Sequence, residues 1–140
     1  MKTFATRALI RASPEAVWQL LTDGPGYPKW NGTVNKVEGT IALGEKITVH
    51  AKISPGRAFP VKVAVWEPNS RMVWASGMPL GLFKGERTFT LSPHDGGVEF
   101  SMREVFSGLL SPLIEKSIPD LQPAFEAFAA DLKARAEQGA

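Results

Sequence analysis

Alternating apolar and polar residues dominate the middle of the chain, from about residue 34 to residue 106. Such alternation is typical of strands that bury one face. Residues that favour turns interrupt the pattern about every ten positions, at 43–44, 54–56, 67–70, 77–81 and 93–97. This spacing predicts an antiparallel meander in which each strand pairs with the next.

Two hairpins of this meander have a register that can be predicted. Pairing about Gly56 would bring the apolar positions of residues 47–53 and 59–65 onto one face. In the last hairpin, Asp95-Gly96 is a strong signal for a two-residue turn. Centring the turn there places Arg87 opposite Glu104. The same register pairs Leu91 with Phe100 and Phe89 with Met102.

Helical signals lie on both sides of the predicted sheet. Residues 3–11 alternate as a first strand, after which Ser13 as N-cap and Pro14 at the first helical position predict a helix ending near Leu21. Residues 27–32 are too few, and too rich in turn residues, for more than one helical turn or a loop. A period of three to four returns after Leu110, predicting a short helix over 112–117 and a long one over 120–137.

This layout predicts a single α+β domain over residues 1–140. A curved antiparallel sheet covered by one long helix tends to enclose a space rather than a solid core, so we expect a cavity for a small hydrophobic ligand. The predicted cavity walls combine inward-facing strand positions with the apolar face of the long helix. On that helix, Phe125 and Phe128 belong to the hydrophobic core, to the cavity wall or to both. The expected wall residues are Phe59, Val63, Phe89, Phe100, Met102, Phe106, Leu121, Phe125 and Phe128, with Trp30 closing the entrance.

Arg87 and Glu104 are the polar candidates for this cavity, because their predicted pairing puts both within an apolar stripe. Charges that leave water need partners, and mutual pairing satisfies both. Three interpretations stay open: a structural ion pair, a pair that also contacts a ligand oxygen, or a register error that exposes both side chains.

Trp66 and Trp74 lie on the opposite alternation from the main apolar stripe of their region, and pairing about Asn69 would put them on one face. They either form a contact in a homodimer or are covered by a helix or loop at the sheet edge.

Composition and motifs exclude several function classes. The 16 basic and 14 acidic residues are scattered, which argues against nucleic-acid binding. With no cysteine and with His50 and His94 far apart in the pattern, we expect no metal site. Motifs for a nucleophile elbow, a phosphate loop or a dinucleotide fold are missing, so we expect no cofactor. The chain has no apolar run long enough for a membrane span and no signal-peptide core, so a cytoplasmic location is expected.

Several segments resemble the SRPBCC superfamily of START and Bet v 1-like helix-grip proteins. They are residues 10–18 (IRASPEAVW), 21–23 (LTD), 27–31 (YPKWN), 65–68 (VWEP), 71–74 (RMVW) and 104–110 (EVFSGLL). The later segments look like the polyketide cyclase/dehydrase-type branch. The resemblance implies a seven-stranded curved antiparallel sheet wrapped around the C-terminal helix, with two short helices after the first strand and a hydrophobic pocket.

The resemblance leaves three functions open. The first is a carrier or sensor of a lipid- or polyketide-like molecule. The second is a cyclase or dehydratase in which Glu104 moves a proton and Arg87 stabilises an enolate oxygen. The third is a protein-binding module similar to Hsp90 activators, acting through a surface that includes Trp66 and Trp74.

Overall fold

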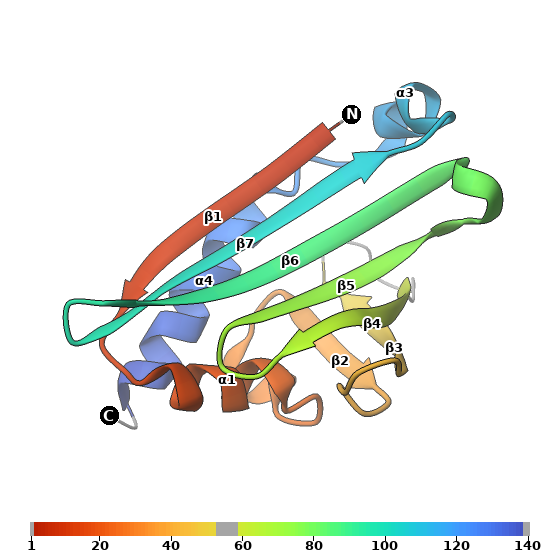
Figure 1. Ribbon diagram of the computed structural model, residues 1–140. Helices are drawn as coiled ribbons and strands as arrows, with labels where there is room; N and C mark the ends of the chain where they lie inside the picture. The colour runs from red at the N-terminus through yellow and green to blue at the C-terminus, as the bar shows by residue number, and fades with distance from the viewer. Residues whose placement is uncertain (1, 53–58, 139–140) are drawn as a thin grey trace.

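The computed structural model describes residues 2–52 and 59–138. Seven strands form one sheet, and a long helix packs against it (Figure 1). The elements are β1 (Lys2–Ile10), α1 (Pro14–Thr22), α2 (Tyr27–Trp30), β2 (Val34–Glu38), β3 (Lys46–Ala51), β4 (Phe59–Glu67), β5 (Arg71–Met78), η1 (Pro79–Gly81), β6 (Phe83–His94), β7 (Gly97–Ser107), α3 (Ser111–Ile114), η2 (Glu115–Ser117) and α4 (Gln122–Gln138).

The sheet has the order β1-β7-β6-β5-β4-β3-β2, and every neighbouring pair is antiparallel. Strands 2 to 7 therefore form a continuous meander, and β1 joins its end by pairing with β7. In Figure 1 helix α4 lies behind the sheet, while α1 lies at its lower edge. This arrangement confirms the predicted curved sheet that holds the C-terminal helix.

The predicted register of the last hairpin is confirmed, since Arg87 pairs with Glu104 and Phe89 with Met102. The register predicted for β3 and β4 is wrong. Ile47 pairs with Val61, whereas pairing about Gly56 requires Val65. Gly56 itself lies outside the described residues. The shift covers an even number of residues, so Ile47 and Val61 still share the inner face.

Local sequence signals account for the helix boundaries. Ser13 Oγ accepts a hydrogen bond from the Ala16 backbone N–H at 3.1 Å, and α1 begins at the following proline. Asp120 lies before α4 rather than within its first turn. Its Oδ1 accepts a hydrogen bond from the Gln122 N–H at 3.0 Å, which satisfies a donor that the helix leaves free.

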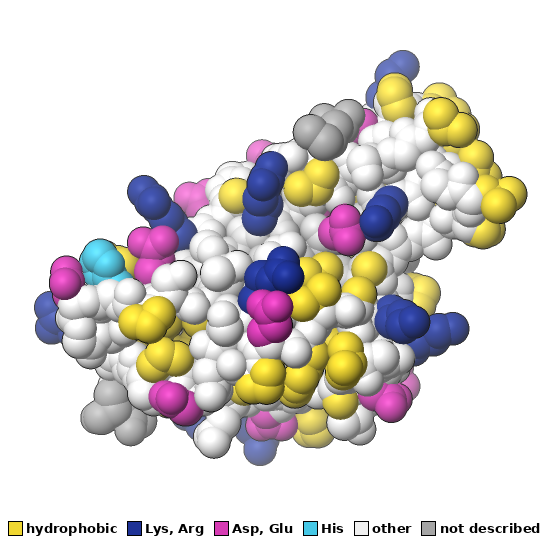
Figure 2. Space-filling view, in the orientation of Figure 1, with side chains coloured by type: hydrophobic (Ala, Val, Ile, Leu, Met, Phe, Trp, Pro, Cys, Tyr) yellow, Lys and Arg dark blue, Asp and Glu magenta, His cyan; other side chains and the backbone are white. Residues whose placement is uncertain are grey.

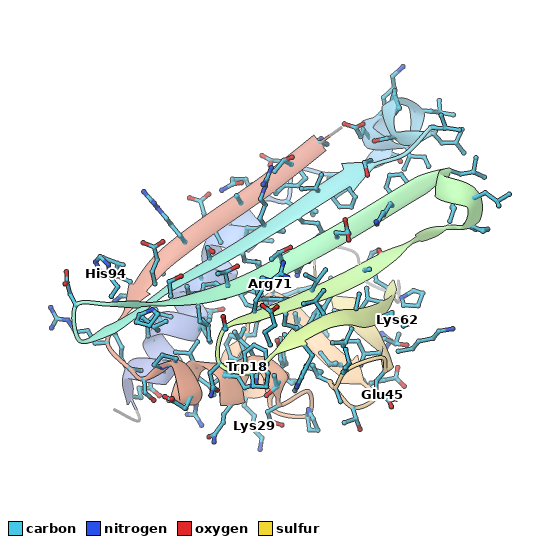
Figure 3. All side chains as sticks on the ribbon, in the orientation of Figure 1. Trp18, Lys29, Glu45, Lys62, Arg71 and His94 are labelled. Atoms are coloured by element: carbon cyan, nitrogen blue, oxygen red, sulfur yellow. The ribbon has the colours of Figure 1, made fainter. Side chains whose placement is uncertain are left out.

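A β-bulge at residue 64 changes the direction of the side chains in β4. The register shifts between Val63 and Val65, so Trp66 pairs with Met72 and turns to the inner face. Its ring lies 5.1 Å from that of Trp18, which Figure 3 shows between α1 and the turn joining β4 to β5. Trp74 is 4% exposed. Trp74 is therefore too buried for the homodimer contact that was one of the two alternatives, and the alternative of a covering helix holds for Trp66, which packs against α1.

Side chains fill the interior completely at the end of the molecule nearest α1. Each residue of this packed end is at most 2% exposed: Leu21, Tyr27, Met72, Phe89, Phe100, Phe128 and Leu132. Polar contacts hold α4 to β1 here. Lys133 Nζ donates to the Leu9 carbonyl at 2.6 Å, and Glu137 Oε2 accepts from the Arg11 N–H at 2.9 Å.

Exposed leucines gather at the opposite end, around η1 and α3. Leu80 is 91% exposed, Leu109 80% and Leu113 68%. Figure 2 shows this end as a projection with clustered hydrophobic side chains. A hydrogen bond of 2.7 Å from the Leu110 N–H to the Leu82 carbonyl joins its two segments. None of the helices in the described part of the chain is long and apolar enough to cross a membrane.

Candidate functional site

A cavity of about 330 Å³ lies between the sheet and the C-terminal helical region. Its walls come from β2 to β7, from α4 and from the segment that leads into α4. The lining residues are Thr33, Val34, Val49, Ala51, Phe59, Val61, Trp74, Ser76, Phe83, Arg87, Met102, Glu104, Phe106, Ile114, Ser117, Ile118, Pro119, Leu121, Ala124, Phe125 and Phe128. The cavity and the packed end thus lie in the same layer between the sheet and the helix, hollow at one end and filled by side chains at the other.

Three residues with polar side-chain groups in the cavity lie in a row across three neighbouring strands. Trp74 on β5 lies opposite Arg87 on β6, and Arg87 lies opposite Glu104 on β7. Val63 and Phe4 continue the row on either side. Directly opposite side chains of an antiparallel pair are close enough to interact. The row therefore presents an indole, a guanidinium and a carboxylate to the same space.

Arg87 and Glu104 form a well-aligned ion pair. Arg87 Nε donates to Glu104 Oε1 at 2.8 Å, and Nη2 lies 2.7 Å from the same oxygen. The side chains are 23% and 13% exposed, and the guanidinium lies 4.8 Å from the centre of the Phe125 ring. Both contacts use Oε1, so within the described part of the chain Glu104 Oε2 and Arg87 Nη1 have no further hydrogen bond. The pair can therefore contact a ligand without breaking.

Three buried nitrogen donors have no hydrogen-bond acceptor among the described residues: Trp30 Nε1, Asn31 Nδ2 and Trp74 Nε1. Of these three residues, Trp74 lines the cavity. Asn31 uses its other amide atom, because its Oδ1 accepts from the Thr33 N–H at 2.8 Å. An unpaired buried donor is costly, and Trp74 brings one to the cavity wall.

Small residues explain why the cavity is hollow. Next to the polar row, Ser76 pairs with Gly85, which pairs with Phe106. A Cβ atom at Gly85 would lie 3.2 Å from Phe106 and 3.3 Å from Ser76 Oγ. Glycine within a strand often marks a close approach of another group. Ala124 adds a third small residue from α4.

The structure places most of the predicted wall residues on the cavity. Those on the cavity are Phe59, Arg87, Met102, Glu104, Phe106, Leu121, Phe125 and Phe128. Three others, Val63, Phe89 and Phe100, are fully buried in the packed core, where Phe89 and Phe100 lie against Phe128 of α4. Trp30 packs at 5.0 Å against Tyr27 and at 5.6 Å against Phe128, and it does not line the cavity. Ligand contact itself stays a prediction for all of them.

Sequence reasoning missed Trp74, Ser76 and the segment from Ile114 to Pro119. Trp74 was assigned to the outer face because its alternation differs from that of β4, and a bulge in a partner strand has no clear sequence signal. Ser76 lies two residues after Trp74 in the same strand and so points to the same face. Assigning Trp74 to the inner face would therefore have placed Ser76 there too. The 114–119 segment has neither strand nor long-helix periodicity, and it contributes to the wall through tertiary packing.

Other titratable groups lie outside the cavity. Tyr27 is fully buried and donates its hydroxyl to the Leu21 carbonyl at 2.7 Å. Burial raises the pKa of this phenol far above its ordinary value. His50 Nε2 lies 2.5 Å from Glu38 Oε1 on the outer face. Among the described residues, His, Asp and Glu do not form a group of three or more that could hold a metal.

Solved structures share this architecture at low sequence identity. A protein named MLL2253 from Mesorhizobium loti has a TM-score of 0.76 at 21% identity, with 99% of each chain covered. The Aha1 dimer from Colwellia psychrerythraea has a TM-score of 0.74 at 24% identity, covering 99% of this chain and 98% of that chain. A START superfamily protein from Mycobacterium smegmatis has a TM-score of 0.70 at 16% identity, with 99% of each chain covered. These similarities show the fold.

No curated protein matches the chain at a significant level. Residues 1–137 match the family described as "Polyketide cyclase / dehydrase and lipid transport", a match that covers every element above except the last residue of α4. The helix-grip sheet, its cavity and this match agree with one another. The chain therefore belongs to the polyketide cyclase/dehydrase and lipid transport family, and it has the fold of START superfamily proteins.

Proposed function

We propose that this protein binds a small hydrophobic molecule in the cavity between the sheet and α4. The observation that supports the proposal most directly is the cavity itself, with apolar walls interrupted by the Arg87–Glu104 pair. Ligand sites in proteins are mostly apolar, with a few polar groups that orient the ligand. The family description, which includes lipid transport, agrees with this function.

The size of the cavity limits the ligand. A volume of about 330 Å³ lies at the lower end of the roughly 300–1,000 Å³ that small-molecule sites occupy. A compact molecule fits this space better than a lipid with two full acyl chains. Burial of apolar area at about 25 cal/mol per Å² supplies the main driving force, from which the entropy lost on binding is subtracted.

Filling the cavity tests the proposal. Ala124 lines the cavity from α4, and Ala127 lies exposed on the same helix. In Ala124→Phe the new ring would occupy the site, so affinity for the fluorescent probe 1-anilinonaphthalene should fall by about tenfold or more. Ala127→Phe is the matched control and should bind the probe like the wild type. Equal probe affinity in both variants, measured by fluorescence titration, would exclude this cavity as the binding site.

Proton transfer in the same cavity is the second candidate function. It is favoured by Glu104 Oε2, which lies beside a guanidinium and has no hydrogen bond in the described part of the chain. A carboxylate in this position can remove a proton while the guanidinium stabilises the resulting enolate oxygen. Glu104→Gln should then abolish turnover of a cyclisation or dehydration substrate and largely spare its affinity. Unchanged turnover would remove Glu104 from this role.

The protein-binding module is not proposed for the surface predicted from the sequence. Trp66 packs against Trp18, and Trp74 lines the cavity, so neither side chain offers an exposed aromatic contact to a partner.

A further inference from the structure

Within the proposed ligand site, on which this inference depends, we propose that the Trp74 indole N–H donates a hydrogen bond to an oxygen of the ligand. The ligand class that fits is a compact aromatic molecule with a carbonyl or phenolic oxygen. The ion pair alone would accommodate many polar groups, whereas Trp74 requires an acceptor.

The first step is the lack of a protein acceptor for Trp74. The side chain is 4% exposed, lines the cavity, and its Nε1 has no partner among the described residues. An indole N–H can act only as a donor. Buried donors in native proteins nearly always have an acceptor, so each exception needs an explanation.

The second step is that the neighbours of Trp74 cannot supply this acceptor. Its ring packs edge-on against Phe89 at 4.8 Å and lies 6.2 Å from Tyr27. The residues directly opposite it are Val63, which is apolar, and Arg87, which has donors and no acceptor. Glu104 stands one strand further along the row, and although its Oε2 has no hydrogen bond among the described residues, it does not accept from Trp74 Nε1. Because no described group accepts from Trp74 Nε1, a bound ligand is the acceptor that this inference assigns to it.

The third step concerns the charge of that molecule. The Arg87–Glu104 pair has no net charge. Arg87 lies directly opposite Trp74, and its Nη1 has no hydrogen bond among the described residues. A ligand oxygen can accept from both the indole and the guanidinium. A cationic ligand would meet the guanidinium at the same place and be disfavoured. A ketone, quinone or phenol oxygen fits these donors.

The fourth step concerns the body of the ligand. Six aromatic side chains line the cavity, and they are Phe59, Trp74, Phe83, Phe106, Phe125 and Phe128. Aromatic pairs gain from edge-to-face and offset stacking beyond their buried area. Phe83 and Phe106 are already stacked, with ring centres 5.9 Å apart. A flat ring system of limited size matches both these walls and the volume of about 330 Å³.

Two probes of nearly equal shape test the inference. 2-Acetylnaphthalene carries a carbonyl oxygen, and 2-isopropenylnaphthalene carries a methylene group in its place. Equilibrium dialysis should show that the wild type binds the ketone about tenfold more tightly, because the ketone pairs a buried donor that the hydrocarbon leaves unpaired. In Trp74→Phe the difference should fall below about twofold, through loss of ketone affinity.

Trp30→Phe is the matched control. It removes another indole with an unpartnered N–H, but one that does not line the cavity, so the preference for the ketone should persist. The wild type offers a second measurement that needs no substitution. In ¹H–¹⁵N spectra the Trp74 indole signal should move downfield with the ketone and not with the hydrocarbon.

Two failures can be distinguished. If the wild type binds both probes in the cavity with equal affinity and the Trp74 indole signal does not respond to the ketone, the inference is wrong and the proposed ligand site stands. If neither probe binds, both the inference and the proposed function are overturned.

Discussion

The two ends of the space between the sheet and α4 are built from the same elements and differ in content. At the packed end, Phe89 and Phe100 on β6 and β7 meet Phe128 on α4, and their ring centres lie 6.0 and 6.2 Å from that of Phe128. Toward η1, the same strands carry Arg87, Gly85 and Glu104, and a cavity of about 330 Å³ replaces the packed rings.

This difference shows that side-chain size, rather than backbone architecture, decides where the fold is solid and where it is hollow. Protein interiors pack as densely as organic crystals, so a space of this size persists only where large side chains are missing from facing positions. Ser76 and Ala124 are small residues of the cavity lining, and Gly85 gives room to the ring of Phe106. The cavity is therefore a property of a few positions, and substitutions should affect the two ends differently.

The largest expected contrast is between Phe89→Ala and Phe106→Ala. Phe89 is fully buried, and its loss should lower the free energy of unfolding by about 3–5 kcal/mol through lost burial and a new cavity. Phe106 already borders a cavity, so its loss enlarges an existing space and we expect it to cost about 1–2 kcal/mol. Urea unfolding measures both, and equal losses would contradict the contrast between the two ends.

The next effect is the removal of one member of the ion pair. Arg87→Met leaves the Glu104 carboxylate partly buried without its cation, and stability should fall by about 1–3 kcal/mol. Replacing both residues, in Arg87→Met/Glu104→Met, should recover most of the loss because no unpaired charge remains. The double variant unfolding at lower urea than the single variant would show that the pair itself stabilises the cavity end.

A smaller effect is expected for Gly85→Ala. The added methyl enters the space beside Phe106, where the contact of 3.2 Å requires a slight shift of the ring. Because alanine restricts the unfolded chain more than glycine does, the two effects should largely cancel, leaving stability within about 1 kcal/mol of the wild type. At Gly77, by contrast, φ is +148° and a Cβ would meet the Phe83 backbone oxygen, so Gly77→Ala should be clearly destabilised. The melting temperatures of both variants, measured by thermal unfolding, separate the effect of limited space for a methyl group from the effect of an unfavourable backbone conformation.

The smallest expected effect is a pH dependence at the packed end. Hydrogen bonds from Lys133 and from the Arg11 backbone N–H lower the pKa of Glu137 below its ordinary value of 4.5. A lowered folded-state pKa means that the stabilisation is present above about pH 4.5 and is lost as the pH falls through the folded-state pKa.

Urea unfolding at several pH values between about 3 and 6 measures this dependence. Glu137→Gln should weaken the loss of stability on acidification. The exposed Glu126→Gln on the same helix is the control and should leave the pH profile as in the wild type. An unchanged profile in Glu137→Gln would mean that this contact does not contribute to the attachment of α4 to β1.

Local signals were sufficient to predict much of the architecture. Asp95-Gly96 determined the register of the last hairpin and hence the pairing of Arg87 with Glu104. Ser13 determined the start of α1, and the three-to-four residue period after residue 120 determined the face of α4 that is buried. These predictions succeed because turn, cap and periodicity signals involve residues close together in the chain.

The tertiary structure alone decided which buried positions face the cavity. The bulge at residue 64 turned Trp66 inward, and the pairing of β5 with β6 placed Trp74 beside Arg87. Val63, Phe89 and Phe100 share the inner face with the wall residues, yet they lie in the packed core, where Phe128 of α4 packs against Phe89 and Phe100. Alternation in a strand specifies a face, whereas the distance between that face and a helix depends on the side chains of both, which become neighbours only after folding.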